Sequence, residues 1–155
     1  MAVKEHSNAL YGFAVRFLRN KEDARDIVQD SFEKLWLNCD KVEHSKAKSW
    51  LFTCTHNAMV NFVTRNQRVV LTETSKLPES SEKNHSQFES QQVVDRIVSI
   101  LPPLQKSIIL LRDLEGYSYE EIGDILDLSP SQVKVYLFRA RNKVKKQLQH
   151  LNIIQ

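Results

Sequence analysis

Apolar residues recur at helical spacing through the first half of the chain. They fall on one face between residues 8 and 20, and again between residues 22 and 37 and between residues 49 and 68. Polar, turn-forming residues separate these segments, and neither half of the chain alternates apolar and polar residues as a strand would. The first half therefore predicts three amphipathic helices.

The segment from residue 72 to 91 has a different composition. It is rich in Ser and Glu, contains one Pro and has few large apolar side chains. This composition is typical of a flexible linker, and its length of about 20 residues allows the flanking parts to lie together or apart. The chain thus divides into two small helical lobes, residues 1–71 and residues 92–155, and the predicted fold class is all-α.

The second lobe begins with two further predicted helices. The first runs from about residue 91 to the proline pair Pro102-Pro103, which ends it. The second runs from Leu104 to about Leu114, and the turn-forming stretch Glu115-Gly116-Tyr117 follows.

Two capping motifs mark the starts of the last two helices. Ser118 and Glu121 form a Ser-x-x-Glu capping box that opens a short helix. After a turn of about three residues, Ser129 and Gln132 repeat the motif, with Pro130 at the first helical position, where its missing N–H costs nothing. A short capped helix, a turn and a longer helix form the pattern of a helix-turn-helix motif.

Charge changes the picture most at the last helix. The 155 residues carry a formal net charge of only +3, but SPSQVKVYLFRARNKVKKQL contains six Lys or Arg and no acid. Such a helix suits a DNA major groove, where its cations meet phosphates or guanine edges. A merely solvated basic face is the alternative, and the capping boxes argue against it because a loose tail needs no defined start.

The first lobe separates its charges between two helices. Asp23, Asp26, Asp30 and Glu33 are three or four residues apart and line up on one side of the second helix. No acid occurs between residues 45 and 72, so the third helix is basic. Its cations and those just before it are Lys46, Lys48, Arg65 and Arg68.

Little in the chain predicts catalysis, a metal or a membrane. Cys39 and Cys54 read as free thiols in a reducing cytoplasm, and no apolar run has signal-peptide or membrane-spanning length. With His44 and His56 these cysteines fit no compact zinc motif. We also find no phosphate-binding Gly-rich loop and no nucleophile–base set, so we expect neither an enzyme nor a cofactor.

These motifs resemble a known family. The second lobe resembles region 4 of bacterial sigma-70-type factors through LPPLQKSIILLRDLEGYSYEEIGDILDLSPSQVKVYLFRARNKVKKQL, and the small extracytoplasmic-function (ECF) sigma factors are the closest branch. The first lobe resembles region 2.1–2.2 through EDARDIVQDSFEKLWLN and region 2.3–2.4 through KAKSWLFTCTHNAMVNFVTRNQR. Two blocks in the right order are far more specific than either alone.

The resemblance implies a function and a domain plan. Residues 1–71 would be region 2, which binds core polymerase and the −10 element; residues 72–91 a flexible linker; and residues 92–155 region 4, which binds the −35 element. Such a protein is a non-catalytic specificity subunit that directs RNA polymerase to promoters and helps to open the DNA. The implied partners are core polymerase, through its β′ clamp helices and β subunit, promoter DNA, and an anti-sigma factor commonly tied to a membrane sensor. The family acts in the cytoplasm on no small-molecule substrate.

The resemblance also implies three sets of site residues. The core-binding positions are Asp26, Gln29, Asp30 and Glu33, with Trp36 nearby. The −10 positions are Asn57, Asn61, Lys46, Lys48, Arg65 and Arg68. The −35 positions are Ser131, Gln132, Lys134, Val135, Phe138, Arg139 and Arg141.

The chemistry of these positions is consistent with such roles, and alternatives stay open. An acidic stripe suits a basic partner, although it could also be a solvated face. The amides of Asn57 and Asn61 can read the edge of a flipped base, or they could simply be exposed. Trp50 could stack on DNA, with core packing the favoured role, and Phe138 could touch a thymine methyl or pack inward.

Two further expectations concern rivals and departures. A DNA-binding regulator that uses the same helix-turn-helix is the main rival; it would need no acidic stripe and would bind duplex DNA without core polymerase.

Gly123 stands where the family usually has Ala, so we expect a helix loosened by up to about 1 kcal/mol.

Overall fold

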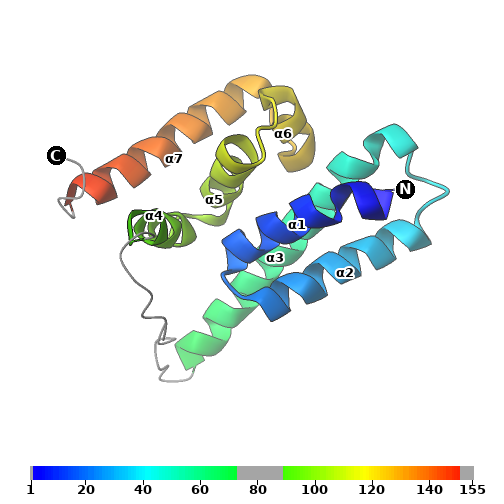
Figure 1. Ribbon diagram of the computed structural model, residues 1–155, viewed down its shortest axis with the longest axis horizontal. Coiled ribbons are helices and arrows are strands. Elements are labelled where there is room, and N and C mark those ends of the chain that lie inside the picture. Colours follow the sequence, from blue (N-terminus) through cyan, green and yellow to red (C-terminus); the bar gives the residue numbers. More distant parts are fainter. Residues whose placement is uncertain (1, 73–88, 151–155) are drawn as a thin grey trace.

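Every element in the described part of the chain is helical, which confirms the all-α fold class (Figure 1). The computed structural model describes the backbone of residues 2–72 and 89–150, and the side chains of residues 6–66 and 92–150. Most of the predicted linker lies outside these ranges. The helices are α1 (Ala2–Leu18), α2 (Lys21–Leu37), the 3-10 turn η1 (His44–Lys46), α3 (Ala47–Thr72), α4 (Glu89–Ser99), α5 (Pro103–Ile109), the π-helical turn η2 (Leu110–Leu114), α6 (Tyr119–Leu126) and α7 (Pro130–His150).

Helices α1, α2 and α3 pack together as the first lobe. The side chain of Asn20 caps α2 by accepting a hydrogen bond from the Asp23 N–H at 3.0 Å, which fixes the tight turn after α1. The apolar stripes predicted from the sequence meet in the core, where the rings of Phe13 and Phe52 lie edge to face at 5.6 Å. Its largest fully buried side chains are Leu10, Phe13, Phe17, Leu51, Phe52 and Met59.

Helices α1 and α3 are longer than the apolar pattern predicts. α1 begins at Ala2 rather than near residue 8, and α3 runs from Ala47 to Thr72 rather than from Ser49 to Arg68. Periodicity marks only the turns that bury a face, whereas backbone hydrogen bonds continue a helix through polar turns.

The second lobe packs α4 to α7 around its own apolar side chains. The predicted helix from Leu104 to about Leu114 exists, but α5 passes into the π-helical turn η2. There the Leu110 carbonyl accepts the Glu115 N–H at 3.1 Å, five residues on, so the turn is wider than in an α-helix. Nothing in the apolar periodicity indicated this wider turn.

Helices α6 and α7 form the predicted helix-turn-helix, and both capping boxes are present. The Ser118 hydroxyl accepts the Glu121 N–H at 3.1 Å, and the Ser129 hydroxyl accepts the Gln132 N–H at 3.1 Å. In return, each N-cap N–H donates to the Glu or Gln side chain three residues on. Asp127 ends α6 in the left-handed conformation (φ 58°, ψ 53°), which Asp tolerates better than most residues.

Gly123 has a packing reason that the sequence did not reveal. A Cβ at Gly123 would lie 2.4 Å from the Leu128 carbonyl oxygen, which belongs to the turn between α6 and α7. Over-packing costs about 1–3 kcal/mol, whereas helix propensity favours Ala by only about 1 kcal/mol. We therefore expect Gly123→Ala to lower the free energy of unfolding by up to about 2 kcal/mol, measured by urea denaturation.

Gly12 in α1 provides the matched control, because a Cβ there would meet nothing within 4 Å. Gly12→Ala should raise the free energy of unfolding by up to about 1 kcal/mol, as helix propensity alone predicts. Equal stabilisation by both substitutions would contradict the clash at Gly123.

The two lobes lie against each other (Figure 1). α3 contacts α6, and α1 contacts both α4 and η2. The length of the linker allowed the lobes to lie together or apart, and the structure has them together. None of the described helices is long and apolar enough to cross a membrane.

Candidate nucleic-acid and polymerase interfaces

Helix α2 buries one face and presents the predicted acidic stripe on the other. The buried residues are Ala24, Ile27, Val28 and Ser31. The exposed residues include all four predicted core-binding positions, Asp26, Gln29, Asp30 and Glu33. The structure therefore brings these four side chains together on one accessible surface, where the carboxylates would attract a cationic partner.

Two large apolar side chains lie at the C-terminal end of the same helix. Trp36 is 79% exposed and Leu37 is 81% exposed. Adjacent exposed side chains of this size are a frequent mark of a protein-binding surface, because a partner removes their apolar area from water. The sequence drew attention to Trp36 alone, and only as a neighbour of the stripe.

Helix α3 exposes both of the predicted base-reading amides. Asn57 and Asn61 are one turn apart and both reach solvent, while the intervening Met59 is fully buried. Lys46 and Arg65 are also exposed. The side chain of Arg68 lies outside the described residues, so its phosphate contact stays a prediction.

A cleft of about 420 Å³ lies beside Asn57. Its lining residues are Lys46, Ser49, Trp50, Thr53, Cys54, Asn57 and Asp124. Asp124 belongs to α6, so the second lobe supplies part of the wall of this cleft. Trp50 is half-buried and packs against the core, which agrees with the favoured role for this residue while leaving one side of it at the cleft.

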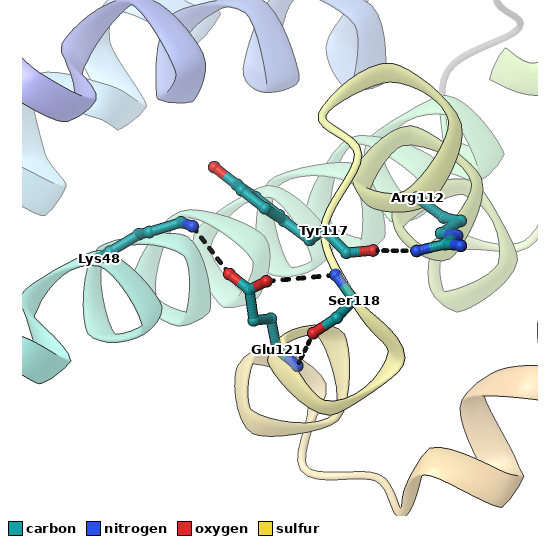
Figure 2. Close-up of polar contacts among 5 residues, drawn as sticks. All are labelled: Lys48, Arg112, Tyr117, Ser118 and Glu121. Carbon is teal, nitrogen blue, oxygen red and sulfur yellow. Dashed lines mark hydrogen bonds and ion pairs between the residues drawn. The ribbon is translucent and has the colours of Figure 1, made fainter.

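Lys48, a predicted −10 phosphate contact, is engaged by the second lobe (Figure 2). Its Nζ lies 2.8 Å from Glu121 Oε2 and 3.9 Å from the centre of the Tyr117 ring. Hydrogen bonding to Lys48 is the largest cause that lowers the pKa of Glu121. Burial, with a smaller contribution from the Glu115 and Glu121 carboxylates, raises the pKa of Tyr117 to about 12. The sequence indicated none of these contacts.

Helix α7 buries a narrow stripe and exposes the predicted −35 positions. The stripe consists of Val133, Leu137 and Ala140. The exposed positions are Ser131, Gln132, Lys134, Val135, Phe138, Arg139 and Arg141. Phe138 is 66% exposed, so its ring does not pack inward, and the contact with a thymine methyl stays a prediction.

Two arginines near this surface are held within the second lobe. Arg141 forms an ion pair with Asp113, and the pKa of Arg141 is raised mainly by that hydrogen bond. Arg112 donates from Nη1 to the Tyr117 carbonyl at 2.8 Å and lies over the Tyr119 ring, which braces the turn before α6. A phosphate contact by Arg141 would have to compete with Asp113.

The contact between the lobes also buries groups that can titrate. His56 Nδ1 and Ser107 Oγ are hydrogen-bonded at 2.6 Å, and burial lowers the pKa of His56 to about 4. Lys106 donates to the Phe17 carbonyl at 3.2 Å and lies over the Phe17 ring, and burial lowers its pKa as well. These contacts join residues 51 and 89 positions apart, so no local motif could have predicted them.

Among the side chains that the structure describes, the histidines and cysteines do not gather into a ligand set. Within residues 6–66 and 92–150, no three His, Cys, Asp or Glu side chains lie close enough to hold a metal ion. Cys39 is exposed, and Cys54 is half-buried with a pKa raised by burial. His56 is hydrogen-bonded to Ser107.

Comparisons with known proteins identify both lobes. The Sigma-70 region 2 family matches residues 2–69, and the Sigma-70 region 4 family matches residues 91–144. The ECF RNA polymerase sigma factor SigM of Bacillus subtilis is 27% identical over 144 residues, which are 90% of this chain and 88% of SigM. The ferric citrate uptake sigma factor FecI of Escherichia coli is 30% identical over 141 residues, 87% of this chain and 82% of FecI.

Solved structures agree over nearly the whole chain. The sigma factor RpoE, in complex with the anti-sigma factor NepR from Bartonella quintana, superposes with a TM-score of 0.77 at 27% identity, covering 95% of this chain and 94% of RpoE. CnrH, in complex with the cytosolic domain of CnrY, gives a TM-score of 0.71 at 25% identity, covering 96% of this chain and 85% of CnrH. Both family regions occur in order, the second contains a helix-turn-helix, and the relatives match across most of their length. The chain therefore belongs to the ECF branch of the sigma-70 family and is a non-catalytic RNA polymerase subunit that directs promoter recognition.

Proposed function

We propose that three helices divide promoter recognition among them. α2 binds the β′ clamp helices of core polymerase through Asp26, Gln29, Asp30 and Glu33, α3 captures the opened −10 strand, and α7 reads the −35 element in the major groove. The observation that carries the proposal is the anchoring of α7. Its start is fixed by a capping box and its inner stripe is buried, so its exposed side chains are held in one orientation.

The residue types on α7 suit a DNA groove. Ser131 lies at the N-terminus of the helix, where backbone N–H groups favour a phosphate. Lys134 and Arg139 are exposed and long enough to reach guanine edges. Val135 and Phe138 are exposed apolar side chains between these cations, and an apolar side chain in a major groove fits a thymine methyl.

Removing Arg139 should weaken binding in a base-specific way. We expect Arg139→Ala to reduce the affinity of the holoenzyme for its promoter by about 5- to 150-fold, the equivalent of a lost bidentate guanine pair worth about 1–3 kcal/mol. The preference at one base pair of the −35 element should relax. Fluorescence anisotropy with a set of singly substituted promoter duplexes measures both effects.

Lys145 supplies the control, because it is an exposed cation further along α7. Lys145→Ala should weaken binding to all sequences alike and reduce the magnitude of the log–log salt slope by about 1. Uniform weakening by Arg139→Ala would place Arg139 on the DNA backbone instead of on a base.

The region 4 lobe should also show strong salt dependence. Four to six phosphate contacts from α7 give a log–log slope of about −3.5 to −5.5. A nearly flat slope in a titration of binding against salt concentration would rule out docking of this helix in a groove.

An anti-sigma factor is the further partner that we propose. The similar structures of RpoE and CnrH are complexes with the anti-sigma factor NepR and with the cytosolic domain of CnrY. The exposed side chains of Trp36 and Leu37, beside the acidic stripe, offer such a partner an apolar surface. This protein would act in the cytoplasm, where sigma factors meet polymerase. An anti-sigma factor tied to a membrane sensor would bind it and keep it inactive.

Run-off transcription tests the proposed function. The purified chain would be mixed with sigma-free bacterial core polymerase and sheared genomic DNA, ideally from the source organism. Discrete new transcripts that require both components support the proposal, and their upstream sequences give the −35 and −10 elements. Tight binding to duplex DNA alone, without core association or transcripts, would instead indicate a DNA-binding regulator.

A further inference from the structure

Arg141 of α7 forms a two-point contact with a carboxylate that lies outside the helix-turn-helix. Its Nε donates to Asp113 Oδ2 at 3.3 Å, and its Nη2 donates to Asp113 Oδ1. Asp113 belongs to the π-helical turn η2, which precedes α6 in the chain. The proposed −35 surface thus includes a guanidinium whose direction is fixed by an acid of another element.

Both ends of this contact are anchored by the fold. The turn η2 is closed by the Glu115 N–H, which donates to the Leu110 carbonyl at 3.1 Å, and the Leu110 side chain is buried. On α7, Ala140 lies directly before Arg141 and is fully buried. Buried packing therefore sets where Asp113 stands relative to α7, and the ion pair at the surface orients the guanidinium.

The contact is too exposed to contribute much to folding. The side chains of Arg141 and Asp113 are 52% and 43% exposed, so water screens the attraction between their charges. Exposed ion pairs of this kind add little to the free energy of unfolding. The main effect of the pair is therefore on the direction and the charge of the guanidinium.

The carboxylate occupies only one edge of the guanidinium. Arginine carries five N–H groups in a planar fork, and the pair with Asp113 uses the one on Nε and one of the two on Nη2. Competition between Asp113 and a phosphate concerns this edge. The neighbouring edge, formed by Nη1 and the second hydrogen of Nη2, points away from the carboxylate, so a phosphate can bind there while Asp113 stays in place.

Arg141 shares one side of α7 with other proposed DNA contacts. Lys134, Phe138, Arg141 and Lys145 are exposed and follow one another at intervals of four, three and four residues, so they line up along the helix. Arg141 lies two turns, or about 10 Å, from Lys134. A guanidinium held at a fixed offset from a base-reading side chain meets a phosphate in only one register of the helix in the groove.

We propose that Asp113 is a specificity-determining residue of the −35 interaction. It holds Arg141 in position for one phosphate beside the −35 element, and it cancels the charge of Arg141 toward DNA that is bound in any other register. The inference rests on the proposed docking of α7 in the major groove. It deepens that proposal by giving an acid outside α7 a role in discrimination against non-specific DNA.

Asp113→Asn tests the proposal, because the amide keeps the shape of the side chain and removes its charge. The guanidinium then gains both freedom and an uncompensated positive charge. The ratio of holoenzyme affinities for a promoter duplex and for the same duplex with a scrambled −35 element should fall about tenfold, the equivalent of one oriented, charge-assisted hydrogen bond. On the scrambled duplex the log–log salt slope should steepen by about 0.9, since one more cation meets phosphate. Fluorescence anisotropy measures both effects.

Two further variants separate the position of the guanidinium from its charge. Arg141→Lys keeps the positive charge but cannot form the two-point contact, so it should lower the affinity ratio as Asp113→Asn does. In an Arg141→Ala background, Asp113→Asn should leave the ratio unchanged, because the carboxylate acts through Arg141.

Glu120→Gln is the matched control. It makes the same change in net charge at an exposed position in the first turn of α6, and it should leave the affinity ratio as in the wild type. Urea denaturation should give Asp113→Asn nearly the wild-type midpoint, which a structural role for the ion pair would not allow.

Four results would overturn the inference: an unchanged ratio in Asp113→Asn or Arg141→Lys, a fall in the ratio that persists in the Arg141→Ala background, the same fall in Glu120→Gln, or a marked drop in the urea midpoint of Asp113→Asn. Failure of the proposed function looks different, because then the wild-type holoenzyme itself binds the two duplexes equally.

Discussion

Replacing Asp26 and Asp30 with Lys should weaken assembly with core polymerase by at least about 100-fold. Both side chains are exposed on α2, one turn apart, within the acidic stripe. Reversal of both charges turns attraction into repulsion, and like charges facing each other in an interface cost several kcal/mol, of which about 3 kcal/mol already corresponds to 100-fold. Size-exclusion chromatography with core polymerase measures the loss, and promoter-directed transcription should fall with it.

The loop between α2 and α3 offers a control with the same change in net charge. Asp40 and Glu43 are exposed there, away from the stripe. The double variant Asp40→Lys, Glu43→Lys should assemble with core polymerase nearly as the wild type does. Equal losses in the two double variants would show that overall charge, and not the stripe on α2, governs assembly. Circular dichroism should show unchanged helicity in both, because all four side chains are exposed.

Acid should lower the free energy of unfolding through protonation of His56. The pKa of His56 is lowered by burial to about 4, against an ordinary value of 6.5. Well above pH 6.5 the imidazole is neutral in the folded and the unfolded chain, so it does not affect the free energy of unfolding there. As the pH falls from 6.5 to 4 only the unfolded chain takes up the proton, which lowers the free energy of unfolding by about 3 kcal/mol in total. Below pH 4 the folded chain is protonated too and the loss levels off.

Urea denaturation at several pH values isolates this effect when it is compared between variants. His56→Gln keeps a polar group that can meet Ser107 but cannot titrate, so its free energy of unfolding should fall less steeply between pH 6.5 and 4 than that of the wild type. His44→Gln removes an exposed histidine and should follow the wild-type curve. Identical slopes for the wild type and His56→Gln would mean that His56 does not remain neutral in the folded chain.

The parts of the fold that the sequence predicted are those set by local interactions. Buried stripes on α2 and α7 follow from spacing of three and four residues, and the capping boxes at Ser118 and Ser129 join residues three apart. The same spacing also predicted which faces would be exposed. All described core-binding and −35 positions are therefore accessible, although their contacts with polymerase and DNA remain predictions.

The parts that the sequence missed depend on distant residues. Lys48 meets Glu121 across 73 positions, and Arg141 meets Asp113 across 28, so two cations assigned to DNA have carboxylate partners in the folded chain. Gly123 appeared to be a weak helix residue, until the Leu128 carbonyl proved to leave no room for a methyl group. The charge and the helix propensity of a residue can be read from the sequence, whereas its contacts depend on which distant residues the fold brings next to it.

Glu121 places a constraint on how this protein can evolve. The same carboxylate accepts the Ser118 N–H at the start of the helix-turn-helix and binds Lys48 of the other lobe (Figure 2). A mutation at Glu121 that weakened the contact between the lobes would also weaken the start of α6, so natural selection cannot adjust the two properties independently at this position. Heritable variation in the strength of that contact is less restricted at Tyr117, whose ring also contacts the other lobe but whose side chain takes no part in the capping box. Related lineages should therefore differ at Tyr117 sooner than at Glu121.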